Sequence, residues 1–521
     1  MPLPTGGILI ECMKKILLAS LLYTLIGGGI FAKNTKPNVI LFLVDDMGLM
    51  DTSVPMLVDK EGNPQKHPLN GFYRTPNMER LAKQGVRFSQ FYAQSVCSPT
   101  RVSLMTGQNS ARHRVTQWIN PETKNQGPAG WDWEGLTSKD ITLPALLKKN
   151  GYHTIFSGKA HFAPTKYEGA DPANLGFDVN IAGCAFGAPG SYFGEDGYGN
   201  LDPKRKKRAI PGLEKYHNTD VFLSEAITRE AISAIDQSLQ KESPFFLYMS
   251  HYAAHSPFQT DPRFGDNYKD SGKSRPAHSF ATLIEGMDKS LGDLMDHLES
   301  KGVEENTLVL FVGDNGSDAP LGDTYGYFSS APLRGKKGTC YEGGLRVPFI
   351  AGWAKPGKAN SFPIAQNAVH HQQIGTVMDI YATILDATGT KNPSDHTIDG
   401  VSLIPQLQGK NNPDRSDHFL CHFPHSHRSS YFTSYRKGDW KLIYRYRTTG
   451  NAEQRAKKAK DALPTCELFN LKDDPYEKTN LAKQKPNKLK TMVKQMMDQL
   501  ETENAIYAID SNKGELKPFL P

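Results

Sequence analysis

The sequence predicts an α/β protein in which a large mixed, mostly parallel sheet is sandwiched by helices and followed by a smaller C-terminal α+β domain. Two observations predict this fold. Apolar runs of strand length alternate with amphipathic helical patterns between residues 38 and 388, which is typical of a largely parallel sheet covered on both faces. From about Asp414 the pattern changes to short aromatic segments separated by turns, which is typical of a short antiparallel sheet.

The elements of the large sheet can be placed in order along the chain. Among the helices, the first has the clearest ends, with Thr75 as its cap, Pro76 in its first turn and Gly85 just beyond it. The expected strands are Asn38–Val44, Tyr152–Ser157, Phe245–Ser250, Thr307–Val312 and Val347–Trp353. The expected helices are Pro76–Gln84, Leu143–Lys149, Val221–Leu239, Phe280–Ser300 and Thr376–Thr388.

The C-terminal part reads as a hairpin, a further strand and a final helix. Tyr431–Tyr435 and Trp440–Tyr446 flank a turn at Arg436–Asp439. Glu467–Leu471 is the next expected strand, and the helix is expected around Asn487–Glu501.

The chain begins with a segment typical of a secretory signal peptide. Met13-Lys14-Lys15 precedes the apolar run ILLASLLYTLIGGGIFA, and Ala32 is a small residue at the expected cleavage point. A membrane anchor is the alternative, but three glycines interrupt the run and it is shorter than a stable membrane span. We therefore expect a signal peptide at 1–32, a main domain at 33–413 and a C-terminal domain at 414–521. The protein would be exported to the periplasm or cell surface of a bacterium, or secreted.

The net charge and the number of cysteines bear on which partners and which compartment to expect. The 521 residues carry a net charge of +6, which falls to +5 when Glu11, Lys14 and Lys15 leave with the signal peptide. This mild excess does not predict nucleic-acid binding, although it would favour a polyanionic substrate. Cys12 would leave as well, so five cysteines remain: Cys97, Cys184, Cys340, Cys421 and Cys466. An odd number in an exported protein leaves at least one thiol to be explained.

Charged or imidazole side chains follow the ends of four expected strands. In open α/β sheets ligands bind beyond the carboxyl ends of the strands, so this recurrence favours an active site. The residues are Asp45 and Asp46, then Lys159 and His161, then His251 and His255, and finally Asp314 and Asn315. The three carboxylates and one amide oxygen suit a hard divalent cation, and Ca²⁺ tolerates ligands from two separate turns better than Mg²⁺ does.

Cys97 precedes a short expected helix, Ser98–Met105, with Pro99 in its first turn. A group in that position faces free backbone N–H donors and the positive end of the helix dipole. Arg101 lies one turn further on and could donate back towards residue 97. These residues alone leave two interpretations open, a thiolate nucleophile with His161 or His255 as its base, or a buried structural cysteine.

The segment CSPTR at Cys97–Arg101, followed by LMTG at Leu104–Gly107, resembles the maturation signature of type I, formylglycine-dependent sulfatases of the alkaline phosphatase superfamily. The resemblance spans roughly residues 36 to 485. The family usually has tryptophan where Ala160 stands, so we expect the local shape of the pocket, rather than the activity, to differ from the family. Other segments similar to the family, in the same order, are Asn38–Gly48, Gly158–His161, His255–Phe258, Gly313–Gly316, Leu333–Pro348 and Glu467–Ala482.

The resemblance implies that a formylglycine-generating enzyme oxidises Cys97 to formylglycine (3-oxoalanine). One hydroxyl of the hydrated aldehyde would attack sulfur, and the second would later expel the sulfate. One Ca²⁺ ion would be held by Asp45, Asp46, Asp314, Asn315 and residue 97. The other implied catalytic residues are Arg101 and Lys159, which would steady the diol, His161, which would act on its second hydroxyl, and Lys337 and His255, which would bind sulfate. Of these, His255 is the candidate for protonating the leaving alcohol, and Lys336 is a neighbouring alternative to Lys337.

The sequence indicates the substrate less clearly than it indicates the reaction. Trp118, Trp131 and Trp133 would suit a sulfated or uronic sugar, or would only pack a long loop. The basic run Lys204–Arg208 lies in a long insertion and is expected to be solvated rather than to contact a polysaccharide. His418, His422, His425 and His427, with Cys421, are spaced too irregularly for a clear zinc signal, and the resemblance makes His422 or His425 a possible subsite residue.

The expected function is that of a sulfatase acting on a sulfated carbohydrate, with marine algal polysaccharides such as ulvan or galactan favoured and animal glycosaminoglycans as the competitor. The expected partners are this substrate and the formylglycine-generating enzyme, with no nucleic acid and no stable membrane span. Two alternatives stay open. One is a phosphomonoester or phosphodiester hydrolase of the same superfamily, and the other is a non-catalytic sulfated-glycan binding protein in which Cys97 is not converted.

Overall fold

The computed structural model describes residues 36–125, 127–322, 329–429, 431–446, 465–510 and 514–520. The expected signal peptide at 1–32, together with Cys12, lies outside these ranges. Pro37–Pro521 form one compact unit, and the division near residue 414 remains a prediction. None of the described helices is both long enough and apolar enough to cross a bilayer.

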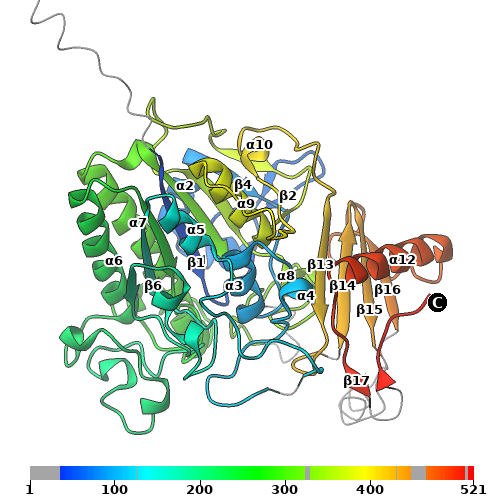
Figure 1. Ribbon diagram of the computed structural model, residues 1–521, viewed down its shortest axis with the longest axis horizontal. Helices are drawn as coiled ribbons and strands as arrows, with labels where there is room; N and C mark the ends of the chain where they lie inside the picture. The colour runs from blue at the N-terminus through cyan, green and yellow to red at the C-terminus, as the bar shows by residue number, and fades with distance from the viewer. Residues whose placement is uncertain are drawn as a thin grey trace, which may run out of the picture. The chain divides into compact units, whose positions relative to one another are not determined.

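A large sheet forms the centre of the fold (Figure 1). In the described residues it has eight strands in the order β11-β4-β10-β9-β1-β8-β6-β7. Strand β10 runs antiparallel to both of its neighbours, whereas the other neighbouring strands pair in parallel. The predicted mixed, mostly parallel sheet is therefore confirmed. In chain order the strands are β1 (Asn38–Val44), β4 (Gly85–Phe88), β6 (His153–Gly158), β7 (Val179–Ile181), β8 (Phe245–Ser250), β9 (Thr307–Gly313), β10 (Phe349–Trp353) and β11 (Ala368–His370).

Helices cover both faces of this sheet because its strands are apolar on both sides. In β1, Val39 and Leu41 point into one hydrophobic core, while Ile40 and Phe42 point into the other. The first core is closed by α3 (Cys97–Thr106), α5 (Leu143–Lys149) and α9 (Val377–Thr388). The second is closed by α2 (Pro76–Gln84), α6 (Leu223–Gln240) and α7 (Arg275–Ser300). Helix α7 begins five residues earlier than expected, where the hydroxyl of Ser274 accepts a hydrogen bond from the amide of Ala277.

A second sheet follows, and it confirms the short antiparallel sheet predicted for the C-terminal part. Its four strands are β13 (His418–Phe423), β14 (Phe432–Lys437), β15 (Trp440–Arg445) and β16 (Cys466–Asn470), all paired antiparallel. The turn between β14 and β15 is two residues long, and Gly438 has a φ of +54° there. Helix α12 (Pro486–Thr502) shares a small hydrophobic core with this sheet.

A buried ion network joins the small sheet to the segment that follows β9. The ammonium group of Lys441 on β15 lies 2.9 Å from Glu342, at the start of the short helix α8 (Glu342–Leu345), and 2.8 Å from Glu477. All three side chains are buried. Lys441 therefore compensates two buried carboxylates, and Arg346 lies 3.5 Å from one of them, Glu342.

We predict that Lys441→Met lowers the free energy of unfolding by roughly 3–5 kcal/mol, because it leaves Glu477 buried without its cation and Glu342 with the more distant Arg346, at 3.5 Å. Urea unfolding followed by circular dichroism measures the change. The matched control is Lys494→Met, which removes an exposed pair with Asp498 on α12 and should cost less than about 1 kcal/mol. Equal losses in the two variants would contradict the prediction.

Candidate functional site

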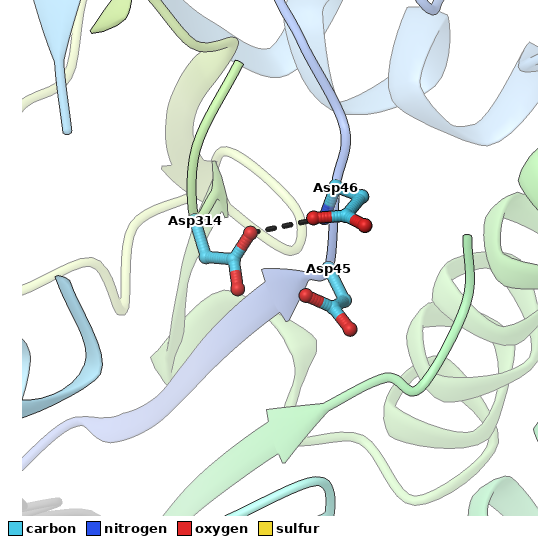
Figure 2. A group of neighbouring side chains, drawn as sticks. All are labelled: Asp45, Asp46 and Asp314. Carbon is cyan, nitrogen blue, oxygen red and sulfur yellow. Dashed lines mark hydrogen bonds between the residues drawn. The ribbon is translucent and has the colours of Figure 1, made fainter. Parts of the chain in front are cut away.

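Three aspartates meet at the carboxyl ends of the two central strands β1 and β9. Val44 and Gly313 pair at the ends of these strands, so the residues that follow them are brought side by side. Oxygen atoms of Asp45, Asp46 and Asp314 lie within 4.8 Å of one another, and all three side chains are buried. Figure 2 shows the carboxyl groups facing a common space, with the amide of Asp46 donating to Asp314 Oδ1 at 2.9 Å.

The donor set fits a hard divalent cation. The Oδ1 atoms of Asp45 and Asn315 are buried and accept no hydrogen bond from the described residues. Buried oxygens without a partner are costly, and oxygen-only ligands are those that Ca²⁺ and Mg²⁺ prefer. Burial, followed by repulsion from Asp45, raises the pKa of Asp314 to about 7. A cation among these carboxylates would relieve both effects.

Each of the three carboxylates also pairs with a different basic side chain. Lys159 lies 2.6 Å from Asp45, and Lys337 lies 2.6 Å from Asp46. Arg101 donates from Nε and Nη2 to Asp314 Oδ2 at 3.1 and 2.8 Å. Burial opposes ionisation of Asp46, but Lys337 and the other nearby cations outweigh it and lower its pKa. The implied site residues Arg101, Lys159 and Lys337 thus come together with the carboxylates.

The position of Arg101 differs in detail from the expectation. Its hydrogen bonds go to Asp314, to the carbonyl of Lys159 and to the hydroxyl of Ser250, rather than towards residue 97. The reason is electrostatic, because a fully buried guanidinium is held most strongly by a buried carboxylate. Arg101 therefore holds the cluster together from within α3.

Cys97 is the first residue of α3 and is buried beside His161. Its Sγ atom lies 3.4 Å from His161 Nδ1, and Nε2 of the same ring lies 2.5 Å from the carbonyl oxygen of Ile119. A carbonyl only accepts, so Nε2 carries the hydrogen and Nδ1 of the neutral ring is an acceptor facing residue 97. Burial, then Lys159, places the pKa of His161 well below its usual range, so the ring is neutral.

The two histidines that follow β8 have different surroundings. His255 Nε2 lies 3.7 Å from Asp46 Oδ2, and its Nδ1 lies 2.9 Å from the carbonyl oxygen of Ser256. Burial, then Lys337, lowers the pKa of His255 to about 4. His251 instead packs its ring on Phe42 and bonds Ser290 at 3.0 Å, so it belongs to the core and not to the site.

A cavity of about 210 Å³ opens onto these groups. Cys97, His161, His255 and Lys337 form one part of its wall, whereas Lys336 lies outside it, 3.9 Å from Asp318. Of the three loop tryptophans, Trp118 lines the cavity. Trp131 packs edge-on against His425 and Trp133 against Tyr167.

The histidine-rich segment that begins on β13 supplies different cavity residues from the two expected. His422 is buried, with Nδ1 at 2.8 Å from Thr433 and Nε2 at 2.8 Å from the carbonyl of Ile506. His425 is buried as well and bonds Thr116. His427 and Arg428 line the cavity instead. The chain leaves the strand at Phe423, so the alternation of side chains that could have identified them no longer applies.

Comparisons with known proteins show which family of proteins this chain matches. The chain matches the family model described as Sulfatase over residues 37–390, and the model described as N-sulphoglucosamine sulphohydrolase, C-terminal, over residues 335–505. It is 31% identical over 389 residues to N-acetylgalactosamine-6-sulfatase of Mus musculus, which covers 71% of this chain and 66% of the mouse protein, just under two thirds of its length.

Two further comparisons cover more of both chains. A sulfatase of Formosa agariphila is 28% identical over 519 residues, which covers 87% of this chain and 86% of that protein. The solved structure of Ps i-CgsB in complex with k-i-k-neocarrahexaose has a TM-score of 0.68 at 24% identity, and the match covers 92% of this chain and 96% of the other. This likeness shows that the fold is shared.

Proposed function

Because the chain belongs to the sulfatase family, we propose that it hydrolyses sulfate esters of a carbohydrate through residue 97. One observation carries the proposal. Cys97 lies in the wall of a cavity that also contains Lys337 and His255, and both of these face Asp46 of the buried carboxylate cluster. A sulfate group in this cavity would meet basic side chains, and residue 97 would be beside it.

Formylglycine at position 97 would supply two hydroxyl groups on one carbon when hydrated, one to accept sulfate and one to expel it. Nδ1 of His161 faces residue 97 as an acceptor and would take a proton from it. Lys337 and His255 would bind the sulfate oxygens from the other part of the wall. The negative charge of the substrate would favour the protonated imidazole of His255, which could then donate to the leaving alcohol.

Asp45, Asp46, Asp314 and Asn315, with residue 97, are the proposed ligands of one Ca²⁺ ion. When bound, the cation would offset negative charge on the sulfate oxygens as a Lewis acid. Lys159 and Arg101 hold Asp45 and Asp314 in position and contribute positive charge to the same site.

For the substrate, we propose a sulfated polysaccharide or its oligosaccharides, with marine algal ulvan or galactan and animal glycosaminoglycans as the two sources to compare. The cavity suits a sugar, since Trp118 offers an aromatic face beside basic groups. The name of the mouse relative, N-acetylgalactosamine-6-sulfatase, supports including amino-sugar sulfates. We also propose that the protein is exported and that a formylglycine-generating enzyme matures it.

The test is to produce the protein together with a formylglycine-generating enzyme and compare a sulfate ester and a phosphate ester of the same alcohol. We expect the mass of the peptide around residue 97 to show conversion, and the sulfate ester to be hydrolysed faster. Faster hydrolysis of the phosphate ester would favour a phosphomonoester or phosphodiester hydrolase. An unmodified thiol in the native host, together with glycan binding, would favour a binding protein. Defined algal and glycosaminoglycan oligosaccharides then identify the sugar.

A further inference from the structure

The cavity holds more basic side chains than the proposed reaction uses. Its described lining residues include Lys337, Arg208 and Arg428. No aspartate or glutamate is among the described residues that line it. Lys337 pairs with Asp46 and belongs to the sulfate position. The two arginines come from segments that are far apart in the sequence, and neither has a role in the proposed reaction. Because Lys337 and Arg428 are paired with Asp46 and Asp318, Arg208 is the one of these three cations without an ion pair among the described residues, and it is available to a second negative charge on the ligand.

Arg428 is fixed beside Lys337 by packing and by an ion pair. A Cβ atom on Gly338, which has a φ of +80°, would lie only 3.1–3.3 Å from three carbon atoms of the Arg428 side chain. The hydroxyl of Ser429 donates to the carbonyl of Gly338 at 2.9 Å, which holds the two segments together. The two terminal nitrogens of Arg428 bind the two oxygens of Asp318. This leaves its Nε hydrogen without an acceptor among the described residues.

Arg208 ends the basic run that the sequence predicts to be solvated, and its side chain is exposed as expected, but it also lines the cavity. Its carbonyl accepts a hydrogen bond from the amide of Gly190 at 2.7 Å, and Ile210, two residues on, is fully buried. The backbone at Arg208 is therefore well anchored, while its side chain is exposed at the cavity. Arg205, in the same run, pairs with Asp196 and Asp202. Arg208 has no ion-pair partner among the described residues.

We propose that Arg208, with Arg428, forms a second anion-binding position in this cavity, so that the preferred substrate carries a second anionic group near the reacting sulfate. The inference rests on the proposed function and narrows its substrate class. The guanidinium of Arg208 can bind carboxylate or sulfate oxygens through two parallel hydrogen bonds, so either anion fits the position, whereas Arg428 offers only its Nε hydrogen because Asp318 takes its two terminal nitrogens. Trp118 and Phe186 add an apolar surface to the same cavity, on which the sugar that carries both groups can lie.

The test uses three matched disaccharides with one sulfated hexosamine. In the first its neighbour is a uronate, in the second the methyl ester of that uronate, and in the third a sulfated hexose. We expect the converted enzyme to prefer the first or third over the second in kcat/KM, mainly through KM. Arg208→Ala should reduce this preference about 10- to 100-fold, the range of a hydrogen bond to a charged group. The control Lys206→Ala, an exposed neighbour outside the cavity, should leave the preference unchanged.

Several outcomes would overturn the inference. It is wrong if the enzyme does not distinguish the uronate or second sulfate from the methyl ester, or if Arg208→Ala slows all three substrates equally. The ratio between the uronate and sulfate substrates shows which anion the position takes. Calorimetric titration of Cys97→Ala protein with the uronate disaccharide and its methyl ester repeats the comparison without turnover. Discrimination in binding without hydrolysis by converted enzyme would refute the proposed function and leave the anion-binding position standing.

Discussion

Replacing Cys97 by alanine is expected to reduce sulfate ester hydrolysis by roughly 10⁶-fold, the loss typical of removing a covalent nucleophile. Alanine has no sulfur to be oxidised, so position 97 would offer no oxygen to attack the ester. The basic groups of the cavity would remain, and the variant should still bind the substrate. Initial rates on a sulfated oligosaccharide, with both proteins produced alongside a formylglycine-generating enzyme, measure the effect.

Two further variants sharpen this result. Cys466→Ala, on β16 of the small sheet, is the matched control and should keep both activity and the mass change at residue 97. Cys97→Ser supplies one hydroxyl group, which can accept sulfate but has no second hydroxyl on the same carbon to expel it. We expect this variant to accumulate covalent sulfate, seen as added mass on the peptide. Full activity in Cys97→Ala would rule out the proposed mechanism.

Removal of divalent cations is expected to abolish hydrolysis and to lower the Tm, and Ca²⁺ should restore both. Three buried carboxylates lie within 4.8 Å of one another, so a cation that binds the folded chain stabilises it. At a free Ca²⁺ concentration of 100 times its Kd, the gain in unfolding free energy is about 2.7 kcal/mol. Thermal melts after treatment with a chelator, with and without added Ca²⁺ or Mg²⁺, measure the gain.

The variant Asp45→Asn tests where the cation binds. It keeps the shape of the side chain but removes one of the three negative charges, and we expect it to lose the Ca²⁺-dependent rise in Tm. Asp293→Asn, a half-buried acid on α7 that pairs with Lys289, is the control and should respond to Ca²⁺ like the natural protein. If Ca²⁺ raised the Tm of Asp45→Asn as much as that of the natural protein, the cation would bind elsewhere.

Much of the fold could be predicted from the sequence where strong patterns have clear ends. Strands β1 and β8 and helices α2 and α5 have the expected bounds because apolar runs or helical periodicity stop at charged residues, prolines or glycines. Strands β4, β7 and β11 were not predicted. They are three or four residues long, too short for periodicity to separate them from loops.

Some residues of the candidate site could likewise be predicted from the sequence, and others could not. The ends of the long strands indicated Asp45, Asp46 and Asp314, and the pairing of β1 with β9 brings them together. Arg208 lies in the basic run that the sequence analysis noted but did not assign to the site, and it ends a short 3-10 helix, Lys206–Arg208. Arg428 follows β13 in an irregular segment. The sequence could not place either residue at the cavity, because the course of both segments depends on distant contacts. The pairing of Arg101 with Asp314 was also hidden, since it joins residues 213 positions apart.

The burial of Cys97 bears on whether its conversion to formylglycine would come before or after the protein folds. The residue is 3% exposed, and every other residue of α3 is buried as well. An enzyme that must bind the backbone around this segment could not reach it once α3 is packed against α9 in the hydrophobic core. Conversion would therefore have to precede folding, and a chain that folded too early would keep its thiol. The proportion of active molecules would then depend on the rate of conversion of Cys97 relative to the rate of folding.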